Sequence, residues 1–381
     1  MGVLNGFRVL EFSEGWTGAA LAGRLLAELG ALVIKVEPPD GDPLRRSAPL
    51  SNGGSIAFDL VNAGKRSVVL DFRGSSEGVK QLRDMAASCD VVVDGLPFRA
   101  LDELCLGETA IRALNPRVIW ADISVFGRAS ALAALPAADI SAQAMSGIMA
   151  TTGFPDEPPT PAGFPLAEHA SAAFGCTAIL AALFHRDQGG DGQAIDIAAV
   201  DCLAYFLSSF LPPVFLGKSA PQRQGFRHPL MAPWDVFEAI DGTVVLCSGT
   251  DAHWVAILRH IGRDDLIHEQ RFASAERRVA AVEEVNAVIQ TWVGSRSAHS
   301  AIAELHSIGV PAGPILNLAQ VFGHAHFQAR QMLTRTADAR STLGSMFKMT
   351  RTPGRVEAAA PVLGADNLLV NDPVPAAGAM A

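Results

Sequence analysis

Short apolar runs alternate with stretches of helical character through the first 125 residues of this chain, and this alternation most limits how it can fold. Because the runs are continuously apolar, they are typical of strands buried on both faces of a sheet. The runs are FRVLEF (7–12), ALVIKV (31–36), SVVLDF (67–72), DVVVDG (90–95) and RVIWADIS (117–124). Helices are predicted between them, at 19–29, 75–88 and 101–114. The order predicts a doubly wound, Rossmann-like α/β domain with a mostly parallel sheet and right-handed crossovers.

The rest of the chain predicts a second, smaller α+β domain. A long helix is expected at 167–187, then a strand at QAIDIA and a helix from about 198. The segment WDVFEAIDGTVVLCSG predicts a hairpin with its turn at Asp241-Gly242. Further helices are predicted at 251–261, 275–294 and 297–307, and GVPAGPILN (309–317) is expected to be a turn. The expected parts are a large domain at 1–210, a proline-rich linker at 211–224, a small domain at 225–315 and a C-terminal segment at 316–381.

Composition favours an ordered protein that does not bind nucleic acid. Hydrophobic residues make up 49% of the chain and charged residues 18%, so a sizeable core can form. The net charge of -9 lacks the basic balance that a general nucleic-acid binder needs. This net charge does not exclude a local basic pocket that binds a phosphorylated ligand.

The cysteines and the N-terminus point to the cytoplasm. The five cysteines are isolated and odd in number, which argues against a disulfide framework or a zinc site. The ten histidines lack metal-ligand spacing, so no metal centre is expected. MGVLNGFRVLEF does not have the pattern of a signal peptide, and no run of about 20 unbroken apolar residues occurs. We therefore expect a cytoplasmic protein without a membrane span.

A glycine-containing turn follows the first predicted strand, in EFSEGWTGAALAG. Its spacing is not GxGxxG, so nicotinamide binding is weakly supported. Two interpretations stay open. The glycines allow a ligand to approach the backbone at a helix N-terminus, or they only form a tight strand-to-helix turn.

Several segments together resemble the class III CoA-transferases, the family of formyl-CoA transferase, the carnitine CoA-transferases and the α-methylacyl-CoA racemases. The matching segments include LNGFRVLEFSEGWTGAALAGRLLAELGALVIKVEPPDGDPLRR, GKRSVVLDFRGSSEG, LNPRVIWADISVFG, AADISAQAMSGIMATTG, GGDGQAIDIAAVDC, RHPLMAPWDVF, RFASAERR and GVPAGPILNLAQV. They occur in the family's order from about residue 4 to about residue 364.

The resemblance implies a fold, a cofactor and partners. The C-terminal segment is expected to return to the large domain, and two chains are expected to form a homodimer of interlocked rings, which would be an exception to the rule against threaded chains. Coenzyme A is the implied co-substrate, with an acyl-CoA and a carboxylic acid as partners. The reaction implied is transfer of CoA from the acyl-CoA to the acid.

One acid, Asp139, lies among small residues in PAADISAQAMSG (136–147), without a cationic neighbour in the sequence. By itself it fits the N-cap of a helix that starts at Ile140. In the resemblance it occupies the position of the catalytic aspartate, which attacks the thioester to give a mixed anhydride and then an aspartyl-CoA thioester. A helix N-terminus favours the ionised form that a nucleophile needs.

The resemblance also implies a CoA site. Its residues would be Trp16, Thr17, Leu70, Asp71, Arg73, Gly95, Leu96, Ser124, Phe126 and Gly127. Backbone amides near Gly18 and in the 225–230 loop would stabilise developing charge. The nearby cations Lys35, Lys65 and Arg66 either lie beside phosphates or are solvated, and for Lys65 the solvated surface is favoured.

Departures from the family pattern leave alternatives open. The family's ENFRPG loop reads DGLPFRA here, and Glu168 replaces the aspartate of GxPxAD. A racemase, epimerase or isomerase of a CoA thioester would use Asp139 as a proton carrier, although the missing histidine beside Asp139 counts against it. A degenerate, non-catalytic subunit is the third alternative.

Overall fold

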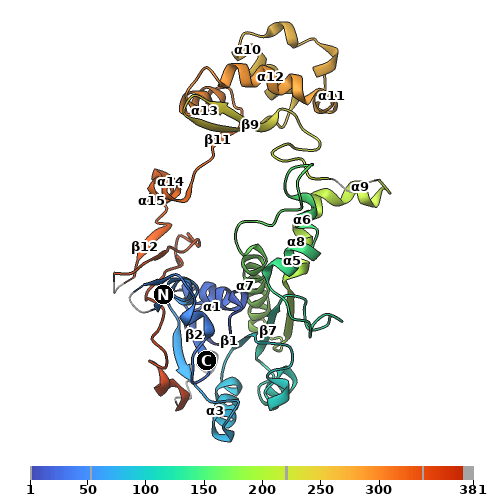
Figure 1. The fold of residues 1–381 in the computed structure, drawn as a ribbon. Coiled ribbons are helices and arrows are strands. Elements are labelled where there is room, and N and C mark those ends of the chain that lie inside the picture. Colours follow the sequence, from blue (N-terminus) through green and yellow to red (C-terminus); the bar gives the residue numbers. More distant parts are fainter. Residues whose placement is uncertain (1, 52–53, 219–221, 337–338, 372–381) are drawn as a thin grey trace. The chain divides into compact units, whose positions relative to one another are not determined.

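The chain separates into two compact units (Figure 1). A computed structural model describes residues 2–51, 54–218, 222–336 and 339–371. The first unit comprises Met1–Ile148, Pro161–Ser209 and Ala325–Ala381, and the second comprises Met149–Thr160 and Phe210–His324. The expected linker at 211–224 therefore falls within the second unit. It opens with a helix, α9 (Leu211–Phe215), because proline is tolerated in a first turn whose N–H groups have no intrahelical partner.

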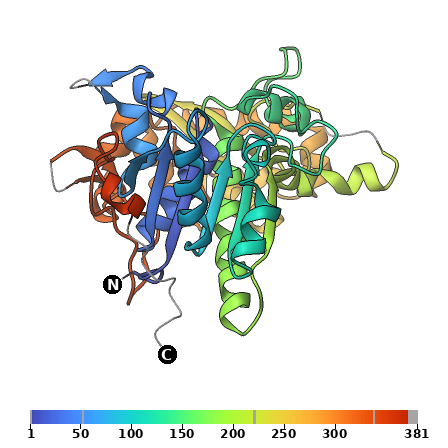
Figure 2. The same ribbon diagram turned by 90° about the horizontal axis from the view of Figure 1, so that it is seen from below.

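A six-stranded parallel sheet forms the centre of the first unit (Figure 2). Its strands are β1 (Arg8–Ser13), β2 (Leu32–Glu37), β5 (Arg66–Val69), β6 (Val91–Gly95), β7 (Ile119–Ser124) and β8 (Ala194–Ala198). They lie in the order β5-β2-β1-β6-β7-β8, so the chain reverses direction across the sheet between β1 and β6. The predicted parallel α/β domain is confirmed.

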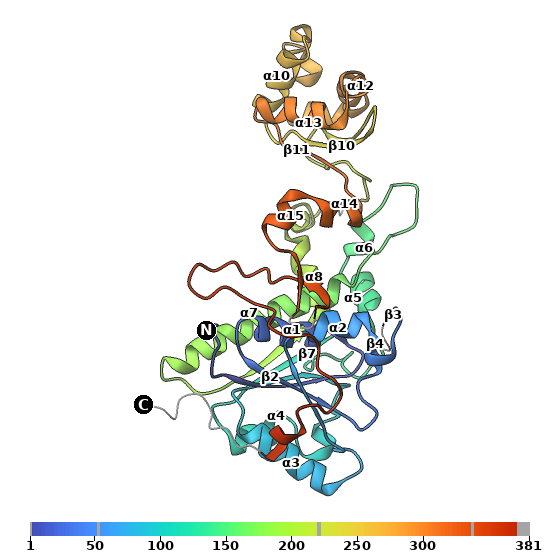
Figure 3. The same cartoon turned by 90° about the vertical axis from the view of Figure 1, so that its left-hand side faces the viewer.

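Helices cover both faces of this sheet (Figure 3). Helices α1 (Thr17–Glu28) and α7 (Leu166–Asp187) pack on the face that carries Val33 and Val91. Helices α3 (Ser76–Ala87) and α4 (Glu108–Leu114) pack on the face that carries Ile34 and Val92. Because neighbouring residues of a strand point to opposite faces, both must be apolar, which accounts for the continuous apolar runs.

The predicted helix at 101–114 is interrupted. A 3₁₀ turn, η2 (Asp102–Leu104), precedes α4. Cys105 has φ 54°, in the left-handed region, and a Cβ on Gly107 would lie 1.7 Å from an oxygen of Asp102. This local geometry stops the first turn and lets a new helix start at Glu108.

Helix α7 has the length and hydropathy of a membrane-spanning segment, alone among the described residues. Half of its apolar window is buried, and its buried face packs on α1 and β7. The buried apolar side chains of α7 therefore form part of the core of the first unit.

Shorter elements complete the first unit. They are η1 (Pro43–Arg46), β3 (Leu50–Ser51), β4 (Gly54–Ser55), α2 (Ile56–Asn62), α5 (Asp139–Met145), α8 (Ala199–Phe206), α15 (Ala325–Ala329), β12 (Leu333–Arg335), β13 (Ser341–Leu343) and η6 (Asn367–Asn371). The C-terminal segment lies along the outer edge of β5. There the side chain of Asp366 accepts from the N–H of Ser67 at 3.0 Å, and Asn367 Oδ1 accepts from the N–H of Val69 at 2.8 Å.

The second unit holds an antiparallel sheet in the order β11-β10-β9, with its own apolar core. Its elements are β9 (Trp234–Ala239), β10 (Gly242–Cys247), α10 (Asp251–His260), α11 (Ala275–Ala280), α12 (Val282–Val293), α13 (Ala298–Ser307), β11 (Ala312–Pro314) and α14 (Leu318–Gly323). Helix α6 (Ile148–Thr151) begins at the boundary between the units.

Two local predictions in the second unit are wrong. Gly242 pairs with Ala239, so the hairpin turn is Ile240-Asp241 rather than Asp241-Gly242. In this register Phe237 and Val244 face each other in the buried core. The segment 309–317 contains the third strand, since Ala312–Pro314 pairs with β10.

Candidate active site

A cavity of about 540 Å³ opens at the carboxyl ends of the central strands of the first unit. It is lined by the turn after β1 (14–16), the end of β6 and the residues that follow it (95–98), the end of β7 with two parts of the following loop (124–126 and 133–138), and Glu168 of α7. In parallel α/β sheets, ligands bind at this edge, where the strand order reverses direction. The cavity is therefore the first candidate for a substrate site.

The structure brings half of the proposed CoA residues together at this cavity. Its lining includes Trp16, Gly95, Leu96, Ser124 and Phe126. Next to the lining, Thr17 begins α1 and Gly127 has a positive φ of 78°. The assignment of these residues to CoA stays a prediction.

The remaining proposed CoA residues do not line the cavity. Leu70 packs in the core between the sheet and α3, and an oxygen of Asp71 accepts from the N–H of Gly74 at 2.8 Å. Arg73 is half-exposed and pairs with the cavity-lining Glu14 at 2.9 Å. Arg73 thus lies beside the cavity and is already neutralised by a carboxylate.

Packing against α1 explains the glycine that replaces the family's asparagine. A Cβ on Gly95 would lie 2.4 Å from the Cβ of Ala19. Such a distance is well inside van der Waals contact, so the end of β6 can approach α1 only without a side chain. The next residue is held as well, since the N–H of Leu96 donates to Asp94 at 3.0 Å.

The carboxylate of Asp139 binds the start of helix α7. Its Oδ1 accepts from the backbone N–H of Glu168 at 3.0 Å, and its Oδ2 accepts from Gln143 Nε2 at 2.5 Å. Asp139 is the first residue of α5, and Ala138 occupies the N-cap. The proposed N-cap role in its own helix is therefore wrong, because the carboxylate satisfies a first-turn donor of α7 instead.

Glu168 is the carboxylate that lines the cavity. It is half-buried, and the backbone N–H of Thr17 favours its ionised form. Burial raises the pKa of Glu168 to about 7, and the negative charge of Asp139 adds to the increase. Near neutral pH this group exists as both acid and carboxylate, which suits chemistry that needs either form.

Sequence reasoning treated Glu168 only as a conservative replacement. One signal was present, since it is the single acid in the first turn of a long apolar helix. Its proximity to Asp139 joins residues 29 positions apart and could not be read from the pattern.

Aspartates on three neighbouring strands form an acidic row beside the cavity. Asp94 pairs in register with Asp122, and Asp122 with Asp196. Arg128 forms ion pairs with Asp94 and Asp122, and its backbone N–H donates to Asp196 at 3.0 Å. Burial raises the pKa of both Asp94 and Asp122, against the opposing effect of Arg128. Through these contacts with Arg128, the three aspartates hold the loop after β7 against the sheet.

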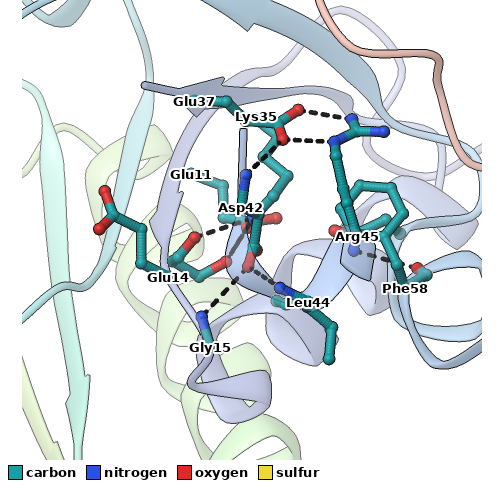
Figure 4. Close-up of polar contacts among 12 residues, drawn as sticks. Glu11, Glu14, Gly15, Lys35, Glu37, Asp42, Leu44, Arg45 and Phe58 are labelled. Carbon is teal, nitrogen blue, oxygen red and sulfur yellow. Dashed lines mark hydrogen bonds and ion pairs between the residues drawn. The ribbon is translucent and has the colours of Figure 1, made fainter. Parts of the chain in front are cut away.

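Two of the three cations proposed to lie near phosphates, Lys35 and Lys65, are buried instead. Lys35 pairs with Glu11 at 3.1 Å and with Asp42 at 2.9 Å (Figure 4). Lys65 also pairs with Glu11. The solvated interpretation of Lys65 is wrong, because its side chain is fully buried and burial lowers its pKa to about 8. Arg66 is more than half exposed and pairs with Asp366.

No group of three or more histidine, cysteine or acidic side chains arranged to hold a metal ion occurs within the described part of the chain.

Residues 4–367 match the family model described as CoA-transferase family III. This chain belongs to CoA-transferase family III. The match includes the whole cavity and both acids, Asp139 and Glu168. The protein is thus a class III CoA-transferase, and a CoA thioester is its co-substrate.

Named relatives of this CoA-transferase resemble it over most of their length. The acetyl-CoA:oxalate CoA-transferase of Acetobacter aceti is 34% identical and covers 88% of this chain and 86% of its own. The succinyl-CoA:mesaconate CoA-transferase of Haloarcula marismortui is 34% identical, with 95% and 94% covered.

Solved structures share the fold of this CoA-transferase. A CAIB/BAIF family protein from Brucella suis matches with a TM-score of 0.85 and 31% identity, over 97% of this chain and 98% of that one. Rv3272 from M. tuberculosis matches with a TM-score of 0.87 and 26% identity, over 97% and 99%.

Proposed function

We propose that this protein moves CoA from an acyl-CoA thioester to a carboxylic acid through a covalent bond to one carboxylate of the Asp139–Glu168 pair. Membership of CoA-transferase family III supports the reaction class. The observation that carries the proposal is the cavity at the carboxyl edge of the sheet, which is lined by a carboxylate with a raised pKa.

Within the pair, the geometry favours Glu168 as the nucleophile. Glu168 lines the cavity, whereas both oxygens of Asp139 already accept hydrogen bonds, from Gln143 and from the Glu168 backbone. The family resemblance favours Asp139, which remains the alternative. We therefore propose that Glu168 is the acyl acceptor and that the charge of Asp139 raises the pKa of Glu168.

The steps balance without an outside reagent. The Glu168 carboxylate attacks the thioester carbonyl, the C–S bond breaks, and a mixed anhydride and CoA thiolate form. The thiolate attacks the glutamyl carbonyl of the anhydride, releases the first carboxylic acid as its carboxylate, and leaves a glutamyl-CoA thioester. The acceptor carboxylate then attacks this thioester, and the thiolate released attacks the acceptor's carbonyl. The products are the new acyl-CoA and free Glu168.

Backbone donors beside Glu168 would stabilise the negative charge that develops in each tetrahedral intermediate. The N–H of Thr17 already favours the ionised form of this carboxylate, and it belongs to the first turn of α1. A helix N-terminus carries partial positive charge and presents unpaired N–H groups. Removing one such donor typically costs about 100- to 1000-fold in rate.

Trapping tests both the reaction and the identity of the nucleophile. The enzyme is incubated with an acyl-CoA and hydroxylamine, which converts an activated carboxyl into a hydroxamate. No lysine or arginine lies between Arg128 and Arg186, so trypsin leaves both acids on one peptide and fragment ions must locate the label. A hydroxamate on Glu168 supports the proposal, and one on Asp139 supports the alternative. Absence of label on either acid contradicts covalent transfer.

A proton transfer at the carbon next to the thioester is the second candidate activity. It is favoured by one observation, the raised pKa of Glu168, which would let this side chain both donate and accept a proton near neutrality. Incorporation of solvent deuterium into the acyl group without a covalent adduct would support it.

A non-catalytic subunit would be indicated if calorimetry found no CoA binding.

We also propose that the protein is a homodimer with the interlocked arrangement that the family resemblance implies. Exposed aromatic side chains of the first unit support a subunit interface, since Phe184 and Tyr205 are 70% and 71% exposed. Sedimentation equilibrium tests this proposal, and a monomer at micromolar concentration would contradict it.

A further inference from the structure

Lys35 is buried beneath the turn that follows β1 (Figure 4). Its Nζ donates to the carbonyl oxygen of Ser13 at 3.0 Å and to Ser13 Oγ at 2.6 Å. It also forms the ion pairs with Glu11 and Asp42. One ammonium group of β2 therefore contacts the end of β1, just before the turn, and Asp42 in the loop after β2.

Asp42 holds the other side of the same turn. Its Oδ1 accepts from the N–H of Gly15 at 3.2 Å and from the N–H of Leu44 at 2.8 Å, while its Oδ2 faces Lys35. Asp42 is itself held, since its N–H donates to Glu37 at 3.1 Å. The pair thus forms hydrogen bonds with the backbone on both sides of the cavity-lining Glu14, at the carbonyl oxygen of Ser13 and the N–H of Gly15.

The turn needs such external support. Gly15 has φ +74°, and a glycine loses more conformational freedom on folding than any other residue. Gly15 and Trp16 line the cavity together with Glu168, and the N–H of the next residue, Thr17, favours the ionised form of Glu168. A small rotation at Gly15 would move that donor away from the reacting carboxylate.

We infer that the Lys35–Asp42 pair is a positioning device that sets the Gly15–Thr17 turn so that the Thr17 N–H meets Glu168. The inference rests on the proposed role of Glu168. Lys35 and Asp42 do not line the cavity and act only through the turn.

Stability alone is a weak reason for placing this pair in the core. Replacing a buried ion pair by apolar side chains is often neutral or stabilising, whereas the directed bonds of a pair specify one backbone geometry. Burial alone would lower the pKa of Lys35, but Glu11 and Asp42 outweigh it and the net shift is upward. Lys35 therefore remains a cation across the pH range of an assay.

Variants of Asp42 test the inference most directly. Asp42→Asn keeps an oxygen that can accept from Gly15 but loses the ion pair, whereas Asp42→Ala loses both. We expect kcat to fall by about 10- to 100-fold in Asp42→Ala and by less in Asp42→Asn, with KM for acyl-CoA nearly unchanged. Lys35→Met should resemble Asp42→Ala.

Arg186→Met is the matched control for loss of a buried cation. Arg186 pairs with Asp90 at 3.1 Å, and both side chains are almost fully buried, at the amino edge of the sheet and away from the cavity lining. This variant should lose thermal stability and keep kcat. Hydrogen–deuterium exchange of a peptide spanning 13–18 should rise in Asp42→Ala and remain at the wild-type level in Arg186→Met.

Two results would overturn the inference: unchanged kcat in Asp42→Ala, or equal loss of kcat in Lys35→Met and Arg186→Met. If Lys35→Met does not fold, the two Asp42 variants decide. Exchange in the 13–18 peptide is independent of turnover. Faster exchange together with absence of a wild-type adduct would therefore contradict the proposed function and not the support of the turn.

Discussion

The carboxylate of Asp139 accepts a hydrogen bond from the backbone N–H of Glu168 at 3.0 Å. This bond places two acids side by side at the start of one helix, with one of them lining the cavity. Their proximity raises the pKa of Glu168 beyond the effect of burial alone. Two adjacent carboxyl groups are a recurring way to separate acid and nucleophile roles at neutral pH.

Glu168→Gln should abolish CoA transfer while leaving the fold intact. The amide is nearly isosteric and can still accept from Thr17, but it cannot form an anhydride. Glu168→Asp should keep a small part of the activity, because it retains a carboxylate displaced by one methylene. Steady-state transfer assays and circular dichroism check both variants. Full activity in Glu168→Gln would remove Glu168 from the covalent pathway.

Asp139→Asn should shift the pH dependence of kcat toward lower pH. A nucleophilic Glu168 must be ionised, so the rate should rise with pH around an apparent pKa of about 7 in the wild type. Removing the charge of Asp139 removes one cause of that raised pKa. A pH–rate profile measures the shift. If instead turnover disappears at every pH, Asp139 is the nucleophile.

Glu168→Gln should also stabilise the protein more at about pH 8 than at about pH 5. The folded-state pKa of Glu168 is raised, so its contribution to stability is full below the unfolded pKa and is lost as pH rises through about 7. The amide avoids this loss. Urea unfolding at the two pH values measures the difference, with the exposed Glu103→Gln as control. An equal effect at both pH values would contradict the raised pKa.

Arg128→Met should destabilise the first unit more at about pH 8 than at about pH 5. Without the guanidinium, the buried carboxylates Asp94 and Asp122 lose their counter-charge, and their pKa values rise further. The stability they contribute is then lost as pH increases. Thermal unfolding followed by circular dichroism gives the comparison, and Arg128→Lys should restore part of the loss. An equal loss of stability at both pH values would show that Asp94 and Asp122 do not titrate in this range.

Gly95→Ala should cost about 1–3 kcal/mol of unfolding free energy, because the added methyl collides with Ala19. Gly163→Ala is the control, since a Cβ at Gly163 meets no atom within 4 Å. Because Gly95 lines the cavity, a shift of β6 should also weaken acyl-CoA binding. Denaturant titration and calorimetry test the two effects. Equal stability of both variants would contradict the close approach.

The pattern of apolar residues by itself determined the strands of the central sheet and the class of fold. Strands β1 and β6 carry consecutive apolar residues, such as Val9-Leu10 and Val91–Val93, because helices cover both faces of the sheet, and a short stretch of sequence shows this pattern. The sequence pattern also predicted the hairpin of the second unit, but it placed the turn one residue too far along the chain. Its third strand, Ala312–Pro314, was missed because three residues that include a glycine and a proline carry little local signal for a strand.

Only the tertiary structure decided which polar side chains act together. The contacts of Glu168 with Asp139, of Lys65 with Glu11 and of Arg128 with Asp94 join residues that are 29, 54 and 34 positions apart. The contact of Arg128 with Asp94 depends on parallel strands bringing their carboxyl ends to one edge, whereas Lys65 reaches Glu11 from the amino end of β5 and the two acids meet at the starts of helices α5 and α7. Burial and charge at that edge, which set the pKa values, follow from long-range packing that a local sequence pattern does not contain.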